Sequence, residues 1–324
     1  MIVTKTPLRI TFTGGGTDLP SFYKEYGPGA VISAAINRYI YIIVNKKFDG
    51  KIRISYSITE IVDNVNQIKH PSVREALRLL GISGGIEIVS ISDIPSEGTG
   101  LGSSSTFLVG LLNALHAFKG EKTSKKQLAE EAVKIEREIL KEPGGKQDQY
   151  MAAFGGIQHM EFHGDESVTI KPILLSEKAK TSLNENLILF YTGKHRKSTE
   201  IHRNQMKEIK DKVESYKKMR DISYQMYDFL SKEDIKKTGR LLHENWMLKK
   251  QLTNGISNDE IDKLYEMAIK AGAEGGKLIG AGASGFLMFY SEKEKHSKIS
   301  EVIGLKSEEF RFEGAGSKII PVSE

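Results

Sequence analysis

Residues 94–105 decide how this chain is interpreted. They read Ile94-Pro95-Ser96-Glu97-Gly98-Thr99-Gly100-Leu101-Gly102-Ser103-Ser104-Ser105, and the apolar run 107–115 follows them. Glycine lets the backbone approach a ligand closely and reach positive φ. The start of a helix presents unpaired N–H groups and the positive end of the helix dipole, which suit a phosphate. Residues 98–105 therefore predict a site for a nucleoside triphosphate, and the alternative is a plain glycine–serine turn.

Two further segments accompany this loop. One reads Pro7-Leu8-Arg9-Ile10-Thr11-Phe12-Thr13-Gly14-Gly15-Gly16-Thr17-Asp18-Leu19-Pro20, and the other reads Leu278-Ile279-Gly280-Ala281-Gly282-Ala283-Ser284-Gly285-Phe286-Leu287. The loop is not a Walker A motif, because no Gly-Lys-Ser/Thr follows its glycines. In order and spacing, the three segments resemble the three motifs of the galactokinase, homoserine kinase, mevalonate kinase and phosphomevalonate kinase (GHMP) superfamily. The resemblance spans nearly the whole chain.

The resemblance implies an α+β fold with two lobes, and the nucleotide bound between them. The N-terminal lobe would be ribosomal-protein-like and the C-terminal lobe ferredoxin-like. The 324 residues are enough for two such lobes. Charged helical patterns begin after residues 187–191, so we place the boundary near residue 185. Residues 1–185 are expected to bind ATP and the sugar, and residues 186–324 to form the C-terminal domain.

Local patterns predict the elements that carry these motifs. β-Branched and aromatic residues predict strands at 2–12, 39–46, 51–57, 85–92, 156–162, 167–172, 187–191, 277–280 and 286–290. Helical periodicity and caps predict helices at 72–80, 103–118, 124–140 and 259–271, and long charged helices over 200–252.

Glu136 lies on the face that the predicted helix 124–140 should bury. At 100° per residue the apolar stripe of this helix extends to Ile139, Glu136 falls near its middle, and Arg137 falls on the opposite side. A lone carboxylate on a buried face is costly unless it is paired, hydrogen-bonded or bound to a metal. One interpretation is therefore a buried ion pair, for which Arg9 is one candidate partner.

The other interpretation of Glu136 is a Mg²⁺ ligand, because Mg²⁺ prefers oxygen donors and nucleotide phosphates. The resemblance implies this role, with Ser104 as the second protein ligand. ATP and Mg²⁺ are therefore the expected cofactors.

Asp148 lies twelve residues after Glu136, behind a Gly-Gly turn. Taken alone, it could cap the segment that begins at Tyr150. The Gly-x-x-Asp-Gln context and the spacing match the sugar kinases of the superfamily, which implies that Asp148 is catalytic. It would accept or orient the proton of the attacking hydroxyl. Arg9 would keep Asp148 ionised and stabilise charge on the transferring phosphoryl group.

The substrate is expected to be a small sugar phosphate. An ionised Asp18 can accept several hydrogen bonds from sugar hydroxyls. The resemblance assigns substrate contacts to Thr17, Asp18, Gly282, Ala283 and Ser284. The segments 14–18, 144–150 and 191–198 are most similar to kinases that phosphorylate the anomeric hydroxyl of D-glycero-D-manno-heptose 7-phosphate, which supplies nucleotide-activated heptose.

Three basic residues are candidates for the distal phosphate of such a substrate. Lys194 and Arg196 stand between a strand end and a helix start, which is a natural anion site. Lys146 lies two residues before Asp148. The alternative for Lys194 and Arg196 is an ordinary basic helix cap that faces solvent.

Composition narrows the remaining possibilities. The chain has no cysteine, which excludes disulfides and thiol catalysis. Its net charge of +5 comes from interleaved acids and bases, which is typical of solvated helices rather than of a nucleic-acid interface. No apolar signal or membrane-spanning segment is visible, so we expect a cytoplasmic protein without membrane or nucleic-acid partners.

Several functions other than heptose phosphorylation stay open. A fucokinase-like enzyme or another sugar-1-kinase would act on an unphosphorylated sugar. A diphosphomevalonate decarboxylase-like lyase would also use ATP, but the Gly-x-x-Asp-Gln context argues against it. A non-catalytic sugar sensor would have no need of Arg9, Ser104, Glu136 and Asp148 together.

Overall fold

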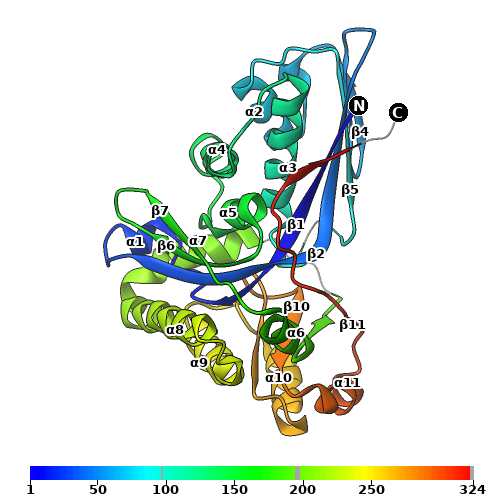
Figure 1. Ribbon diagram of the computed structural model, residues 1–324. Helices are drawn as coiled ribbons and strands as arrows, with labels where there is room; N and C mark the ends of the chain where they lie inside the picture. Colours follow the sequence, from blue (N-terminus) through cyan, green and yellow to red (C-terminus); the bar gives the residue numbers. More distant parts are fainter. Residues whose placement is uncertain (96–97, 194–197, 322–324) are drawn as a thin grey trace.

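Two β-sheets form the framework of the protein (Figure 1). The computed structural model describes residues 1–95, 98–193 and 198–321. Within these residues, eight strands form one sheet, in the order β12-β1-β2-β5-β3-β4, with β6 paired to β2 and β7 to β6. Its strands are β1 (Ile2–Thr13), β2 (Gly29–Lys46), β3 (Ile52–Ser55), β4 (Thr59–Val62), β5 (Ile86–Ser92), β6 (Ile157–Phe162), β7 (Val168–Pro172) and β12 (Lys318–Ile320).

The long strand β2 joins the two halves of this sheet. It pairs with β5 through residues 40–46 and with β6 through residues 29–34. β1 pairs along both halves, with register shifts at Pro7/Leu8 and at Thr11/Thr13. Proline lacks the N–H of a regular ladder, so a shift at Pro7 lets the strand bend. Beyond the bend, the backbone N–H of Arg9 donates to the Leu101 carbonyl (3.0 Å).

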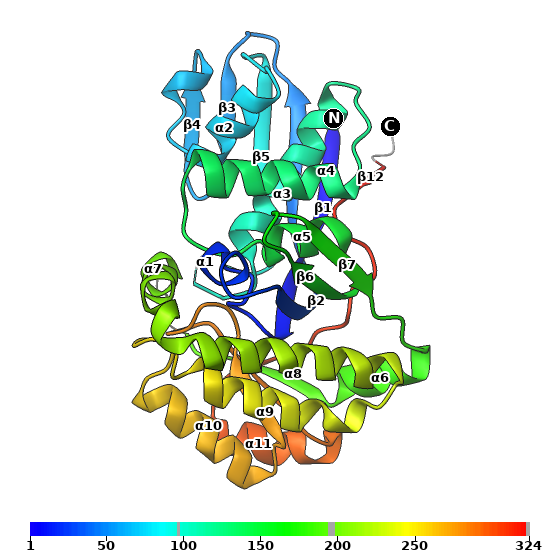
Figure 2. The same cartoon turned by 90° about the vertical axis from the view of Figure 1, so that its left-hand side faces the viewer.

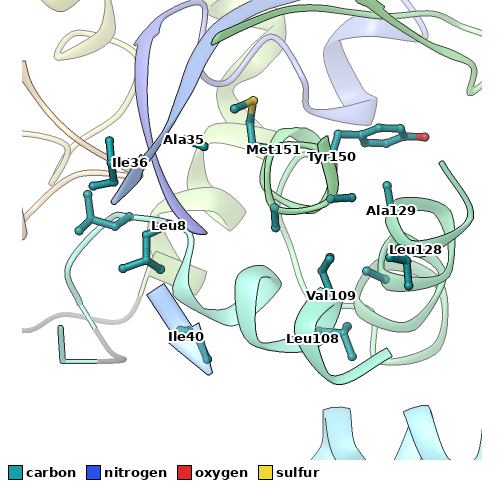
Figure 3. Packing of buried hydrophobic residues seen from close by; sticks show 14 of the residues in the cluster. Leu8, Ala35, Ile36, Ile40, Leu108, Val109, Leu128, Ala129, Tyr150 and Met151 are labelled. Atoms are coloured by element: carbon teal, nitrogen blue, oxygen red, sulfur yellow. The ribbon is translucent and has the colours of Figure 1, made fainter. Parts of the chain in front are cut away.

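Helices cover one face of the first sheet and form the main core (Figure 2). They are α2 (Pro71–Leu79), α3 (Ser103–Phe118), α4 (Lys125–Val133) and α5 (Gln147–Phe154). α3 is the central one and is buried on most of its surface. Figure 3 shows its Leu108 and Val109 in the same cluster as Leu8 of β1 and Met151 of α5. This packing holds in place β1, α3 and α5, the elements that carry Arg9, Ser104 and Asp148.

The second sheet holds four strands of the described residues, all antiparallel, in the order β11-β8-β10-β9. These are β8 (Leu187–Tyr191), β9 (Gly275–Leu278), β10 (Phe286–Tyr290) and β11 (Ser307–Glu308). The remaining helices are α1 (Pro20–Tyr23), α6 (Glu177–Glu185), α7 (Ser198–Glu208), α8 (Val213–Ser231), α9 (Thr238–Lys249), α10 (Asp259–Ala271) and α11 (His296–Ile303). α8 packs against β2 and α9 against β9, so helices connect the two sheets.

The expected α+β architecture is confirmed, and several elements begin and end where the pattern predicts. α3, α10, β8 and β10 match the predicted ranges, whereas β2 begins at Gly29 rather than at Tyr39. Within the described part of the chain, no helix combines the length and the apolar character needed to cross a bilayer.

The division into residues 1–185 and 186–324 stays a prediction. It separates most of the two sheets, but β12 near the C-terminal end pairs with β1. Phe312 also bridges to Ile36 of β2. The last part of the chain therefore returns to the first sheet.

The predicted single helix 124–140 is wrong in its second half. Ser124 caps α4 as expected, accepting from the Gln127 N–H, but residues 134–139 form a π-helix. A π-helix closes each hydrogen-bonded ring with one more residue than an α-helix does, which shifts the positions of all following side chains. Ile139, placed in the buried stripe by the pattern, is 42% exposed. Arg137, placed opposite to it, has a side chain only 18% exposed.

Candidate active site

The glycine loop, residues 98–102, lies between the two sheets. Gly98, Gly100 and Gly102 all have positive φ, at 72°, 75° and 79°. Side chains are disfavoured in this conformation, so the alternating glycines are required by the path of the backbone. α3 begins at Ser103, directly after the loop, and the first N–H groups of a helix have no partner within the helix.

A larger cavity, of about 490 Å³, opens against this loop. It brings together most of the predicted site residues: Arg9, Gly98, Thr99, Gly100, Gly102, Ser103, Ser104, Ser105, Glu136, Asp148, Gly282 and Ser284. Leu101 and Ala283, which are also predicted site residues, do not line the larger cavity. Leu101 is buried in the core, and the Ala283 N–H donates to the Ile256 carbonyl (3.0 Å).

Arg9 and Asp148 form a two-pronged ion pair at one end of this cavity. Arg9 Nε donates to Asp148 Oδ1 and Nη2 to Oδ2, both at 2.7 Å. A third Arg9 nitrogen, Nη1, donates to the Gly100 carbonyl, which ties the pair to the glycine loop. Burial alone would raise the pKa of Asp148, but the charge and hydrogen bonds of Arg9, together with the charge of Arg137, outweigh it and hold that pKa below its ordinary value. Asp148 is therefore ionised at neutral pH.

Glu136 lies beside the start of α3 and is 1% exposed. Its carboxylate accepts hydrogen bonds from Ser104 Oγ (3.0 Å), Ser105 Oγ (2.8 Å) and Gln149 Nε2. The buried ion pair considered for Glu136 is present, but its partner is Arg137 rather than Arg9, because Arg9 bonds to Asp148. Arg137 Nη2 lies 3.7 Å from Glu136 Oε2.

The oxygens around Glu136 fit a hard divalent cation. One carboxylate and two serine hydroxyls line the cavity side by side, and Mg²⁺ is commonly held by one or two carboxylates together with nucleotide phosphates. Within the residues described, no cluster of three or more His, Cys, Asp or Glu side chains could hold a metal without such help.

A smaller cavity, of about 60 Å³, adjoins the larger one. Six residues line both cavities: Arg9, Arg137, Asp148, His202, Gly280 and Ala281. The smaller cavity alone is lined by Thr11, Gly15, Gly16, Asp18, Leu19, Gly145, Gln147, Gln205 and Lys249. The Arg9–Asp148 pair therefore stands at the junction of two spaces.

Asp18 is a wall of the smaller cavity and is 2% exposed. It accepts from the Gly16 N–H (3.0 Å) and the Gln147 N–H (3.2 Å). Burial raises the pKa of Asp18, with the neighbouring Asp148 charge acting in the same direction. A β-carbon on Gly145 would overlap the Asp18 carboxylate, so glycine leaves the room that this side chain fills.

Of the predicted substrate residues that the structure describes, Thr17, Lys146 and Ala283 line neither cavity. Thr17 exchanges hydrogen bonds with the Ala30 backbone (3.0 Å each), which holds the turn after β1. Lys146 pairs with Glu166. Lys194 and Arg196 lie outside the described residues, as does the phosphate site predicted from them.

Three cationic or ionisable residues were missed by the sequence patterns. Arg137 enters both cavities because the π-helix turns it inward, and a regular helical period gives no sign of that. His202 of α7 and Lys249 of α9 come from helices whose charged pattern indicated solvent exposure. Their burial depends on contacts between segments far apart in the chain, and no local signal in the sequence reveals it.

Lys249 is the most buried of these, at 4% exposed. Its Nζ donates to the Gly280 carbonyl (2.7 Å). Burial lowers its pKa to about 8, although the neighbouring Asp18 opposes this shift. At neutral pH the smaller cavity therefore holds a positive charge close to its titration point.

Comparison with known proteins places the chain in a family. The models for the GHMP kinases N terminal domain and the GHMP kinases C terminal region match residues 66–156 and 226–303. The chain is 30% identical to the D-glycero-alpha-D-manno-heptose 7-phosphate kinase of Campylobacter jejuni, over 98% of each. It is 25% identical to the galactokinase of Pyrococcus furiosus, over 93% of this chain and 92% of that protein.

Solved structures agree with this assignment. A crystal structure titled as a D-glycero-D-manno-heptose 1-phosphate kinase from Bacteroides thetaiotaomicron superimposes with a TM-score of 0.83, at 25% identity and full coverage of both chains. The chain belongs to the GHMP kinase family. It is thus a kinase, and the kinases of this family use ATP.

Proposed function

We propose that the protein transfers the γ-phosphoryl group of ATP to the anomeric hydroxyl of D-glycero-D-manno-heptose 7-phosphate. The anomeric oxygen bonds to the γ-phosphorus, the bond from that phosphorus to the β–γ bridging oxygen breaks, and ADP and the 1,7-bisphosphate leave. The observation that carries this proposal is that Arg9 and Asp148 line both cavities. ATP phosphates in the larger cavity and a sugar in the smaller one would meet at this pair.

Asp148 would orient the attacking hydroxyl and accept its proton. A carboxylate with a lowered pKa is a weak base, but phosphoryl transfer proceeds mostly through positioning and charge stabilisation. Arg9, held by Asp148 and the Gly100 carbonyl, would place its charge next to the transferring group. Asp18 would accept hydrogen bonds from sugar hydroxyls on the other side of the junction.

Glu136 and Ser104 are the residues proposed to hold Mg²⁺ with the nucleotide. When bound, the ion would neutralise charge on the phosphate oxygens. Ser105 and Gln149 would keep the Glu136 carboxylate in place through the hydrogen bonds that they already donate to it.

Replacing Glu136 with glutamine should raise the Mg²⁺ concentration that gives half-maximal rate by about tenfold or more. Hydrogen bonds and contacts to a charged group contribute ~1.5–3 kcal/mol, and ~1.4 kcal/mol corresponds to a factor of ten. The measurement is the initial rate against free Mg²⁺ at fixed ATP. Glu138→Gln, on the exposed side of the same π-helix, is the matched control. An unchanged Mg²⁺ dependence in Glu136→Gln would contradict the assignment.

The acceptor needs a direct test, because the names of the relatives differ. The Campylobacter jejuni protein is named for the 7-phosphate, and the Bacteroides thetaiotaomicron structure for the 1-phosphate. The two sugar phosphates would attack the γ-phosphorus of ATP through different hydroxyls. The experiment is ADP release with heptose 7-phosphate, heptose 1-phosphate, the free heptose, fucose, galactose and mevalonate diphosphate in turn.

Turnover of heptose 7-phosphate, with a new phosphorus signal coupled to the anomeric proton in ³¹P NMR, is the expected result. Turnover of heptose 1-phosphate alone would move the reaction to the other end of the sugar. Turnover of a free sugar alone would favour a fucokinase-like activity, and carbon dioxide release from mevalonate diphosphate would indicate a lyase. If no acceptor leads to ADP release, the result would favour a non-catalytic sugar sensor.

The Lys249 charge should make the KM for the acceptor depend on pH. Lysine is charged below its pKa, so this charge is present at pH 7 and is lost as the pH rises through about 8. If the anionic acceptor needs the charge, its KM should rise by about tenfold between pH 7 and pH 9. Lys249→Arg stays charged over this range and should remove the rise. A wild-type KM that is flat over this interval would show that the charge is not used.

A further inference from the structure

One face of α7 presents three polar side chains to the two cavities. Thr199, His202 and Gln205 are spaced three residues apart, so they lie on the same side of the helix. Thr199 and His202 line the larger cavity, and His202 and Gln205 line the smaller one. α7 is therefore a shared wall, and His202 stands at the junction beside the Arg9–Asp148 pair.

Two nitrogen atoms on this face lack a hydrogen-bond partner among the described residues. They are Gln205 Nε2 and His202 Nδ1, and both atoms are buried. Gln205 as a whole is 1% exposed. Buried polar groups in folded proteins are almost always hydrogen-bonded. Because both residues line the smaller cavity, a ligand in that cavity is the natural partner for the two atoms.

The chemistry of this face suits hydroxyl groups. Burial lowers the pKa of His202 to about 4, and the charges of Arg137 and Lys249 act in the same direction. The neutral ring has one nitrogen that donates and one that accepts, and the glutamine amide is uncharged. Arg137 and Lys249, two cations that also line the smaller cavity, suit the anionic part of a substrate.

We propose that Gln205 and His202 determine which acceptor the enzyme takes. Gln205 Nε2 donates a hydrogen bond to one hydroxyl oxygen of a sugar in the smaller cavity, and His202 Nδ1 bonds a second hydroxyl at the junction. The Asp18 carboxylate accepts hydrogen bonds from the sugar hydroxyls. This inference rests on the proposed function, since it needs a polyhydroxylated acceptor in this cavity. A site built in this way discriminates against an analogue that lacks the hydroxyl, because the buried group is then left unpaired.

The first experiment compares Gln205→Met with wild type. Methionine keeps the length of the side chain but removes its amide, so the KM for the acceptor should rise about ten- to hundredfold while the KM for ATP stays unchanged. Lys207→Ala, on the exposed side of α7, is the control and should change neither constant. If Gln205→Met does not fold, Gln205→Glu is tested in its place, because it keeps the shape of the side chain and removes the N–H donor.

The second experiment uses singly deoxygenated acceptors. One of them should lose about tenfold in kcat/KM with wild type and show no further loss with Gln205→Met, because the same hydrogen bond is removed twice. His202→Asn, which keeps a nitrogen near the Nδ1 position, should retain more activity than His202→Leu. Equal losses of every deoxy acceptor in wild type and in Gln205→Met would overturn the proposal.

The two experiments also separate this inference from the proposed function. If wild type phosphorylates a different sugar, the heptose assignment fails, while the variants still test α7 through the KM of that sugar. If heptose 7-phosphate is turned over and Gln205→Met matches wild type, the function stands and the role of α7 is wrong.

Discussion

Asp148→Asn should lower kcat by about 10²- to 10⁴-fold, the usual contribution of a general acid or base. Asparagine keeps the shape of the side chain but neither accepts a proton as readily nor balances the Arg9 charge. The KM for ATP should change little, because we propose that the glycine loop, and not Asp148, holds the nucleotide phosphates. The measurements are kcat and both KM values with the acceptor that wild type uses.

The loss in Asp148→Asn must be distinguished from unfolding. Arg9 is buried, and removing one partner of a buried ion pair costs about 3–5 kcal/mol of stability. The double variant Arg9→Met/Asp148→Asn removes both charges and should regain part of that stability, yet it should stay inactive. Asp63→Asn, at an exposed carboxylate, is the control for the substitution itself. Retention of more than about a tenth of the wild-type kcat would exclude Asp148 as the proton acceptor.

Gly280→Ala should weaken ATP binding by about tenfold or more and also destabilise the protein. Gly280 has a φ of +86°, and a β-carbon there would lie 2.5 Å from Gly100 Cα. A β-carbon on Gly100 would in turn overlap the Ile279 carbonyl. The two loops are thus packed backbone against backbone, and both line the larger cavity. Any side chain between them must move the glycine loop and with it the proposed phosphate site.

A second glycine in the same conformation provides the control. Gly81 has a φ of +66°, and a β-carbon there would meet no atom within 4 Å, so Gly81→Ala adds backbone strain alone. Both variants should lose ~1–2 kcal/mol of stability from that strain. Only Gly280→Ala should raise the KM for ATP. Equal KM values in the two variants would show that the contact between the loops is not needed for nucleotide binding.

Much of the candidate site could be predicted because it lies on local motifs. The glycine loop, Arg9, Glu136 and Asp148 all come from short segments with characteristic spacing, and the structure brings them to one cavity. Asp18, for which a contact with the substrate is predicted, lines the smaller cavity. The roles assigned to these residues stay predictions until the variants are measured.

The rest depends on contacts between distant segments. Arg137 was placed on the wrong side because the π-helix breaks the period from which its direction was calculated. Lys249 and Gln205 belong to polar helices, and only their tertiary contacts bury them. Lys146 is held by Glu166, which lies in the turn between β6 and β7, and nothing in the sequence around Lys146 indicates that partner.

The return of the last strand to the first sheet has a consequence for synthesis of the protein. β12 completes one edge of β1, pairing Val3 with Ile320. While the chain emerges from the ribosome, β1 can pair with β2 early, but its outer edge has no partner until β12 has been synthesised. Unpaired strand edges are sites of intermolecular pairing, and contacts of such long sequence separation form slowly. The newly made protein is therefore most exposed to aggregation along β1 until residues 318–320 have been synthesised and have paired with it.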